Sequence, residues 1–205
     1  MKRGFFILCI IGVVIYILVG NEEQKVTADE LKDKLLRYHV VANSDSDEDQ
    51  ETKLKVKEAV LEALSGKLEE AENAKEAASI VKDNEELILA TANKVLKEDG
   101  ATYTATMRVG EEYFPTKIYG DLTLPPGEYD ALVIELGAGE GKNWWCVLFP
   151  TLCFIEPTCG VLPEESKEKL SGVLTTEEYC AVIKDENTEI RVESKLLNWI
   201  NKMID

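Results

Sequence analysis

The sequence predicts an α+β protein, with N-terminal helices packed on a mostly antiparallel sheet and a helix at the C-terminus. Apolar residues recur at helical spacing through the first half of the chain. From Thr102 onward they alternate with polar residues, which is the period of a half-buried strand. Segments rich in Pro and Gly, at 125–127 and 137–141, separate the strand patterns as turns. Helices on one face of a sheet would bury both patterns.

The N-terminus has the form of an export signal. Lys2 and Arg3 precede an apolar run, residues 5–19, and a highly charged chain follows it. As a helix this run is roughly 22 Å long, which is short for a hydrocarbon core of about 30 Å. Residues 1–20 are therefore predicted to be a signal peptide. Because Leu18 stands where cleavage prefers a small residue, an uncleaved membrane anchor remains the alternative.

After the leader, local signals predict a helix and then a strand. Residues 27–36 carry leucines at helical spacing, and Thr27 with Glu30 has the form of a capping box. Residues 37–42 (RYHVVA) are rich in β-forming side chains and predict a buried strand.

Two longer helices are expected next. Residues 48–68 carry a broad apolar stripe, with Ser46 as a natural N-cap. A further helix is expected to begin at Asp83 and to stop at Gly100. Its inward positions are predicted to be Leu87, Ile88, Thr91 and Val95.

The second half predicts strands at 102–109, 117–119, 129–136 and 144–149. A structured segment at 176–184 and a last amphipathic helix follow, the helix carrying Ile190, Leu196, Leu197 and Ile200. We therefore divide the chain into the leader (1–20), one domain (21–160) and a C-terminal extension (161–205).

Charge limits the classes of partner. The chain has 23 basic and 39 acidic residues, a formal net charge of −16, and two of the basic residues lie in the leader. Such a surface repels nucleic acid, whose binding depends on cationic contacts with phosphate, and anionic lipid headgroups. The charge suits a protein in water or one that binds a basic partner.

Four cysteines follow the leader, namely Cys146, Cys153, Cys159 and Cys180. An even number outside the cytoplasm suggests disulfides. Three connectivities are possible, and we prefer Cys146 with Cys153 and Cys159 with Cys180, which pairs neighbours along the chain. The chain lacks a C-x-x-C motif and has one histidine, His39, so a zinc site is disfavoured.

The most unusual motif is NWWC at 143–146. Adjacent residues of a strand point to opposite faces, so one of Trp144 and Trp145 is expected in the core. The other is exposed as a protein-contact anchor or is covered by another element.

The acidic segment 43–50 begins like a calcium loop, but Gln50 and Val56 stand where an EF-hand requires Gly and Glu. A helix start explains it, and weak cation binding or a partner contact is the alternative. The glycine-rich segment 137–141 lacks a G-K-[ST] end and predicts a hairpin turn. A single histidine and the lack of G-x-S-x-G give nucleophilic catalysis little support. We therefore predict no catalytic residue, metal or cofactor.

Two segments resemble one family. The first is HVVANSDS at 39–46, continued by Asp49, Gln50, Lys53 and 55–57 (KVK). The second extends from YFPTKIYGD at 113–121 through LP at 124–125 and GEY at 127–129 to NWWCVLFP at 143–150 and LCF at 152–154. The chain resembles stage II sporulation protein R over roughly residues 30–155. It departs at Lys57, Glu58 and Thr151, where Arg, Asp and Pro are usual.

The resemblance implies a secreted signalling protein of endospore-forming bacteria. Such a protein is made in the forespore and exported into the intermembrane space. There it activates a membrane-embedded aspartic protease of the mother cell, which processes pro-sigma-E. As a ligand it has no chemistry of its own, binds no nucleic acid, and contacts membrane only through an uncleaved leader.

Candidate contact residues for that protease are Trp144, Trp145, Asn143 and Tyr119, with Asn43 and Asp45 as second choices. The alternative function is an extracytoplasmic hydrolase that acts on cell wall through paired carboxylates. A structural coat or envelope component is a third hypothesis.

Overall fold

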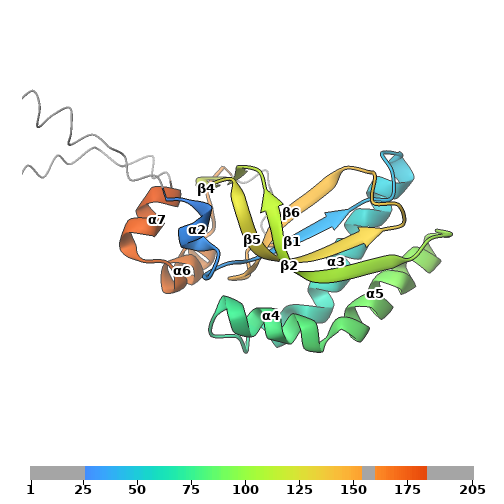
Figure 1. The fold of residues 1–205 in the computed structure, drawn as a ribbon, viewed down its shortest axis with the longest axis horizontal. Coiled ribbons are helices and arrows are strands. Elements are labelled where there is room, and N and C mark those ends of the chain that lie inside the picture. The colour runs from blue at the N-terminus through green and yellow to red at the C-terminus, as the bar shows by residue number, and fades with distance from the viewer. Residues whose placement is uncertain (1–25, 154–159, 184–205) are drawn as a thin grey trace, which may run out of the picture.

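The computed structural model describes residues 26–153 and 160–183 (Figure 1). Its helices are α2 (Ala28–Leu31), α3 (Asp47–Leu68), α4 (Ala74–Asp83), α5 (Glu85–Glu98), α6 (Glu164–Val173) and α7 (Thr176–Val182). Its strands are β1 (Leu36–Val41), β2 (Ala105–Phe114), β3 (Lys117–Tyr119), β4 (Leu122–Leu124), β5 (Gly127–Leu136) and β6 (Asn143–Phe149). The predicted α+β class is confirmed.

The main sheet has four strands in the order β2-β5-β1-β6. β5 pairs antiparallel with β2, and β1 pairs antiparallel with β6, whereas β1 runs parallel to β5. The sheet is therefore mostly antiparallel but is not a simple meander, because β1 is inserted between two strands from the far end of the domain. β3 and β4 form a separate two-stranded ribbon.

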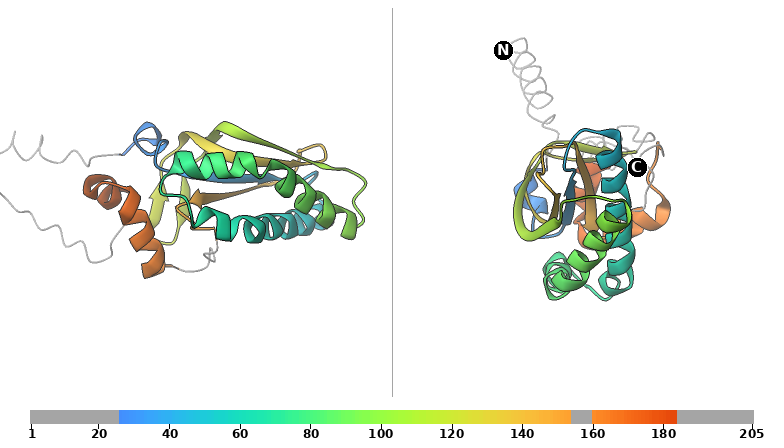
Figure 2. Two further views of the ribbon diagram at one scale, coloured as in Figure 1. Left: turned by 90° about the horizontal axis from the view of Figure 1, so that it is seen from below. Right: turned by 90° about the vertical axis from the view of Figure 1, so that its right-hand side faces the viewer.

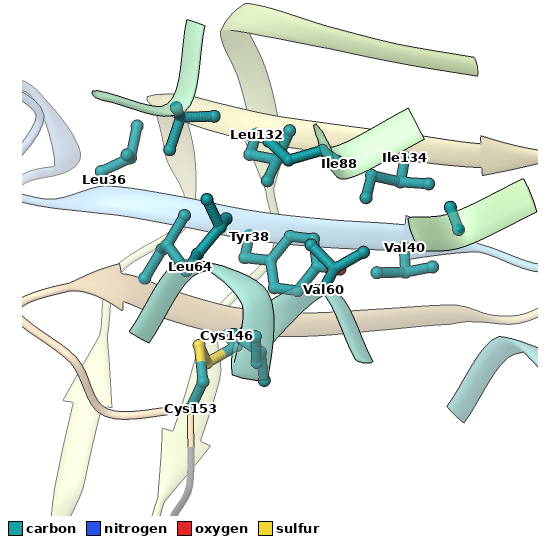
Figure 3. Close-up of a cluster of buried hydrophobic side chains, with 14 of the residues drawn as sticks. Leu36, Tyr38, Val40, Val60, Leu64, Ile88, Leu132, Ile134, Cys146 and Cys153 are labelled. Atoms are coloured by element: carbon teal, nitrogen blue, oxygen red, sulfur yellow. A yellow bond between two sulfur atoms is a disulfide. The ribbon is translucent and has the colours of Figure 1, made fainter. Parts of the chain in front are cut away.

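Side chains of β1 alternate between two cores. Leu36, Tyr38 and Val40 point to the face covered by α3, α4 and α5, where they meet apolar residues of those helices (Figures 2 and 3). The opposite face packs against α2, the β3–β4 ribbon, α6 and α7. Burial on both faces explains why the whole strand is buried although Arg37 and His39 belong to it.

The helix termini follow the predicted signals. Ser46 caps α3 by accepting a hydrogen bond from the Asp49 N–H at 3.2 Å, and the Glu30 carboxylate accepts from the Thr27 N–H at 2.7 Å. The predicted inward stripe of α5 is partly wrong. Leu87 is 39% exposed, and the buried positions are Ile88, Ala92 and Leu96, with Val95 packed beside them. Residues 74–83, for which no helix was predicted, form α4 with Ala74, Ala77 and Val81 buried.

The C-terminal extension packs on the domain as far as it is described. Leu162, Leu170 and Val182 are buried in the second core. Asp121 binds this segment by accepting from the Leu162 N–H at 2.7 Å and by an ion pair with Lys167 at 2.9 Å. The leader and the predicted last helix lie outside the described residues. Within the described ranges, no helix combines the length and apolarity needed to cross a membrane.

Candidate partner-binding site

The two tryptophans lie on opposite faces of β6, as the strand period requires. Trp144 faces the helices and meets the Tyr38 ring edge-on, with centroids 5.6 Å apart. Trp145 faces the other side, stacked on His39 with centroids 3.6 Å apart and edge-on to Phe114 at 4.7 Å. Both indoles are only half-buried. Since β6 is an edge strand, both remain accessible beside solvent.

A lysine lies over each indole. The Lys57 Nζ is 5.0 Å from the Trp144 centroid, and the Lys117 Nζ is 5.2 Å from the Trp145 centroid. These distances suit cation–π attraction, which orients the rings. We call Asn143, Trp144 and Trp145 with these lysines the β6 platform.

His39 supports the platform from beneath. Its side chain is nearly buried, and its Nε2 lies 2.7 Å from the Asn143 Oδ1. Because that oxygen only accepts, Nε2 carries the hydrogen and Nδ1 is the unprotonated nitrogen of a neutral ring. Burial lowers the pKa of His39, although Asn143 and Glu112 act in the opposite direction. The imidazole is thus held neutral against the indole.

Glu112 faces the second nitrogen of this ring. Its Oε1 is 3.5 Å from the His39 Nδ1, which has no hydrogen-bond partner among the described residues. Glu112 also forms an ion pair with Arg108, which lies on the same face of β2, four residues earlier in the chain. The charge of the Glu112 carboxylate is therefore neutralised by Arg108. The unprotonated Nδ1 of His39 accepts no hydrogen bond from a described residue.

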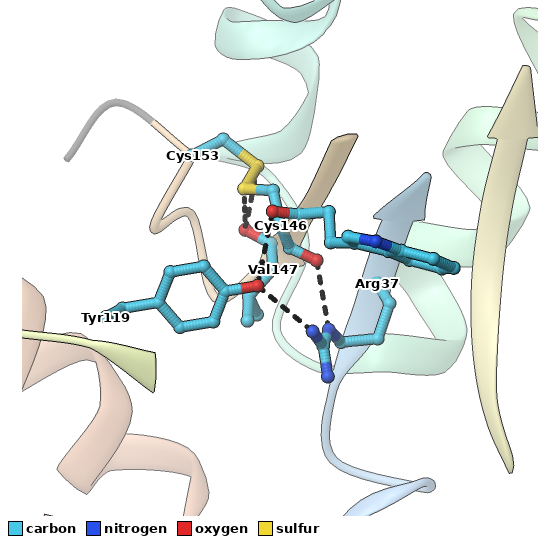
Figure 4. The surroundings of a disulfide bond; sticks show 6 residues. Arg37, Tyr119, Cys146, Val147 and Cys153 are labelled. Carbon is cyan, nitrogen blue, oxygen red and sulfur yellow. Dashed lines mark hydrogen bonds between the residues drawn. A yellow bond between two sulfur atoms is a disulfide. The ribbon is translucent and has the colours of Figure 1, made fainter. Parts of the chain in front are cut away.

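Arg37 is fully buried on the same face as His39. Its Nε donates to the Cys146 carbonyl at 3.0 Å and its Nη2 donates to the Tyr119 hydroxyl at 3.1 Å (Figure 4). The guanidinium lies 4.2 Å from the centroid of Phe114. Burial lowers the pKa of Arg37, and no carboxylate of the described residues pairs with it. Aromatic faces and neutral acceptors thus take the place of a counter-ion.

Tyr119 has an internal role. Its hydroxyl accepts from Arg37 and donates to the Trp145 carbonyl at 3.2 Å. It is half-buried and fastens β3 to the edge of β6. The predicted contact residue therefore positions the backbone of Trp145.

A disulfide joins Cys146 of β6 to Cys153, with Cα atoms 5.5 Å apart. Both cysteines are buried in the first core (Figures 3 and 4). The Leu152 N–H donates to the Val147 carbonyl at 3.2 Å within the closed turn. This is one of the two preferred pairs. Cys180 is exposed and forms no disulfide with a described residue, and Cys159 lies outside the described residues.

Asn43 and Asp45 lie at the end of the sheet that carries Asn143, because Val41 pairs with Asn143. Asn43 donates to the Asp49 Oδ2 at 2.9 Å and accepts from the Ala138 N–H at 3.0 Å, so it is used internally. Asp45 is exposed. Within the described parts of the chain, no group of three or more His, Cys, Asp or Glu residues is placed to hold a metal.

Of the six candidates, β6 brings Asn143, Trp144 and Trp145 together, whereas Tyr119 and Asn43 have internal partners. Sequence reasoning missed Arg37, Arg108 and Glu112. A signal existed for Arg37, because residues 37 and 39 of a strand share one face and two basic side chains there indicate a polar layer inside the domain.

Residues 32–158 match the family described as Stage II sporulation protein R. This range contains the whole platform and its supports. The chain belongs to the stage II sporulation protein R family. It is 32% identical over 185 residues to stage II sporulation protein R of Bacillus subtilis (strain 168), covering 84% of this chain and 83% of that protein. No solved structure matches the fold. As a member of the family, the protein has a role in sporulation.

Proposed function

We propose that this protein is an exported signal of endospore formation that activates a membrane-embedded aspartic protease, which then processes pro-sigma-E. Membership in the stage II sporulation protein R family carries the proposal. Lys2, Arg3 and the apolar run after them support export across the forespore membrane into the intermembrane space. There the protein acts as a ligand without chemistry of its own, anchored only if residues 5–19 remain.

The β6 platform is the proposed contact with the protease. Trp144 and Trp145 are half-exposed on an edge strand, and aromatic side chains of this kind dominate many protein interfaces. Asn143 is exposed beside them, and although its Oδ1 bonds to His39, its amide NH₂ supplies a polar group at the rim. Asp45 at the same end of the sheet is a further available contact. The internal bonds of Tyr119 and Asn43 give these two a supporting role.

Activation requires that the ligand bind the active form of the protease better than the inactive form. A shift from about one active molecule in a hundred to ninety-nine in a hundred needs about 5.5 kcal/mol of differential binding. Three hot-spot side chains, each contributing about 2 kcal/mol of differential binding, reach that value. The two tryptophans and Asn143 are enough for such an interface.

The test is reconstitution in vegetative cells that produce the protease, pro-sigma-E and this protein. An immunoblot follows the size of pro-sigma-E. The full chain is expected to cause processing, and a chain without residues 1–20 is expected to cause none, because it stays in the cytoplasm. Processing by the cytoplasmic form would contradict the proposed location. No processing by a folded, exported chain would contradict the activator function.

The platform is tested in the same cells with Trp144→Ala, Trp145→Ala and Asn143→Ala. Each is expected to lower processing about tenfold or more, as loss of a hot spot does. Leu87→Ala is the matched control, because Leu87 is 39% exposed on α5, a helix that packs mainly on α3 and β2. Circular dichroism and urea unfolding check that each variant is folded. Normal processing by folded tryptophan variants would exclude the platform as the contact.

A further inference from the structure

We propose that the free edge of β2, together with the groove between β2 and α4, binds an extended acidic segment of the protease as an added β-strand. This inference rests on the proposed function and concerns a surface distinct from the β6 platform. The two edges of the sheet differ in the hydrogen bonding of their outward backbone groups, and lysine side chains line the groove beside β2.

The outward backbone groups of β2 follow from its register. Thr104 accepts from the Gly137 N–H at 3.0 Å, so even-numbered residues of β2 pair toward β5. The backbone N–H and C=O groups of odd-numbered residues therefore point outward, away from β5. The Ala105 N–H confirms this parity, because the Asn93 side chain of α5 caps it from outside at 2.9 Å.

Between Ala105 and Glu111, the β2 edge is open, and at Glu111 the outward carbonyl accepts from the Arg108 Nη1 at 3.4 Å. In the described part of the chain, no group bonds to the outward N–H groups of Met107 and Val109. On β6, the other edge, two outward carbonyls are already bonded, because the Trp145 carbonyl accepts from Tyr119 and the Val147 carbonyl accepts from Leu152. An open edge strand is a ready template for another strand, and proteins ordinarily cover such edges.

A groove of about 650 Å³ lies beside this edge. One wall is a stripe of α4 with Lys75, Ala78, Ser79 and Lys82, and the other is Val109 and Gly110 of β2. A strand added to β2 would direct every second side chain toward α4.

The charged side chains that line the groove favour an acidic segment as its occupant. Acidic residues outnumber basic ones by 39 to 23 in the chain, yet the groove has three lysines, Lys32, Lys75 and Lys82, against Asp33 and Asp130. Lys32 is paired with Asp29 at 3.3 Å. Lys75 and Lys82 form no ion pair with any described residue. Two unpaired ammonium groups on one helical stripe favour carboxylates in the added strand.

A second copy of this chain fits the edge poorly. Two molecules that each have a formal net charge of −16 repel one another. The occupant is therefore a segment of the partner.

Val109→Pro tests the backbone contact. Proline removes the outward N–H but no ladder bond, and edge strands tolerate it. In the vegetative-cell assay we expect at least a tenfold loss of pro-sigma-E processing, whereas Val109→Thr, which keeps the N–H, retains processing. Lys75→Glu with Lys82→Glu is expected to cause a similar loss. Its matched control is Lys94→Glu with Lys97→Glu on the exposed face of α5, which changes net charge equally.

Photo-crosslinking reports the contact directly if Val109→Pro fails to fold. p-Benzoylphenylalanine replaces Tyr113, which is 56% exposed on β2, or Leu54, which is 43% exposed on α3. We expect the protease to be captured from position 113 and not from position 54. If wild-type protein activates the protease while no β2 variant loses activity and position 113 gives no crosslink, the β2 inference is overturned and the activator function stands. If wild-type protein itself fails, the activator function falls.

Discussion

The indole of Trp145 lies on the imidazole of His39, with ring centroids 3.6 Å apart and planes 14° from parallel. The contact joins an edge strand to the central strand β1, so the orientation of the platform depends on a buried, neutral histidine. Asn143 fixes the tautomer of that histidine from the platform itself. Trp145 at the surface and His39 in the interior are therefore held in position by one another and by Asn143.

Stability should fall as the pH drops below about 6.5. Burial lowers the pKa of His39 in the folded protein, so the unfolded chain binds the proton first. The stabilisation is complete above the unfolded pKa and is lost as the pH falls toward the folded value. His39→Gln should flatten this slope, measured as the free energy of urea unfolding between about pH 5 and pH 8.

Asp49 serves as an internal reference for that measurement. Hydrogen bonds from Ser44, Tyr103 and Asn43 lower the pKa of its carboxyl, so its contribution is lost only in more acidic solution. If His39→Gln keeps the wild-type slope near neutrality, another group is responsible for it.

Replacing Arg37 by a side chain of similar length should destabilise the protein less than replacing it by a small side chain. Arg37→Ala should cost about 3 kcal/mol or more, because it leaves a cavity between Phe114 and Tyr129. Arg37→Met should cost less than about 1.5 kcal/mol, because it keeps the packing and removes a buried charge without a carboxylate partner. Urea unfolding compares the two. Equal losses would show that the bonds to Tyr119 and the Cys146 carbonyl outweigh packing.

The Cys146–Cys153 disulfide should stabilise the fold by about 2 to 3 kcal/mol, from the entropy of a short closed loop in the unfolded chain. A reductant should lower the urea midpoint of the wild type. Cys180→Ala, at an exposed position, should keep this sensitivity. The double variant Cys146→Ala, Cys153→Ala should begin from a lower midpoint. A double variant as stable as the oxidised wild type would contradict a stabilising bond.

Gly137→Ala should destabilise the protein by about 2 kcal/mol or more. Gly137 has φ +59°, and a Cβ there would lie 2.2 Å from the Asn43 Oδ1, which holds the following turn. Gly66→Ala on the exposed face of α3 is the control. With no atom within 4 Å of the new Cβ, it should raise stability by about 0.5 to 1 kcal/mol. Thermal unfolding measures both, and equal effects would contradict the role assigned to Gly137.

Local elements were predictable from the sequence because their causes are local. The Ser46 cap, the Thr27–Glu30 pair and the alternation along β2 each depend on residues a few positions apart. α4 was not predicted, since its buried positions Ala74, Ala77 and Val81 are mostly small. The insertion of β1 beside β5 was not predicted either, because parallel pairing brings together segments separated by three helices and three strands.

The site was predictable in part. Strand period places Trp144 and Trp145 on opposite faces of β6. The bonds of Tyr119 to Arg37 and of Asn43 to the Ala138 turn connect distant segments, and no pattern near either residue indicates them. The free edge of β2 could be identified only once strand order was known.

The central position of β1 bears on how the chain folds. β1 is the first strand made, yet both of its neighbours, β5 and β6, come from the end of the domain. A nascent chain that ends before β5 therefore holds an apolar strand with no neighbour on either side. Because such distant pairing must overcome a large loop-closure entropy, we expect slow acquisition of the native state and poor solubility of fragments truncated before residue 127.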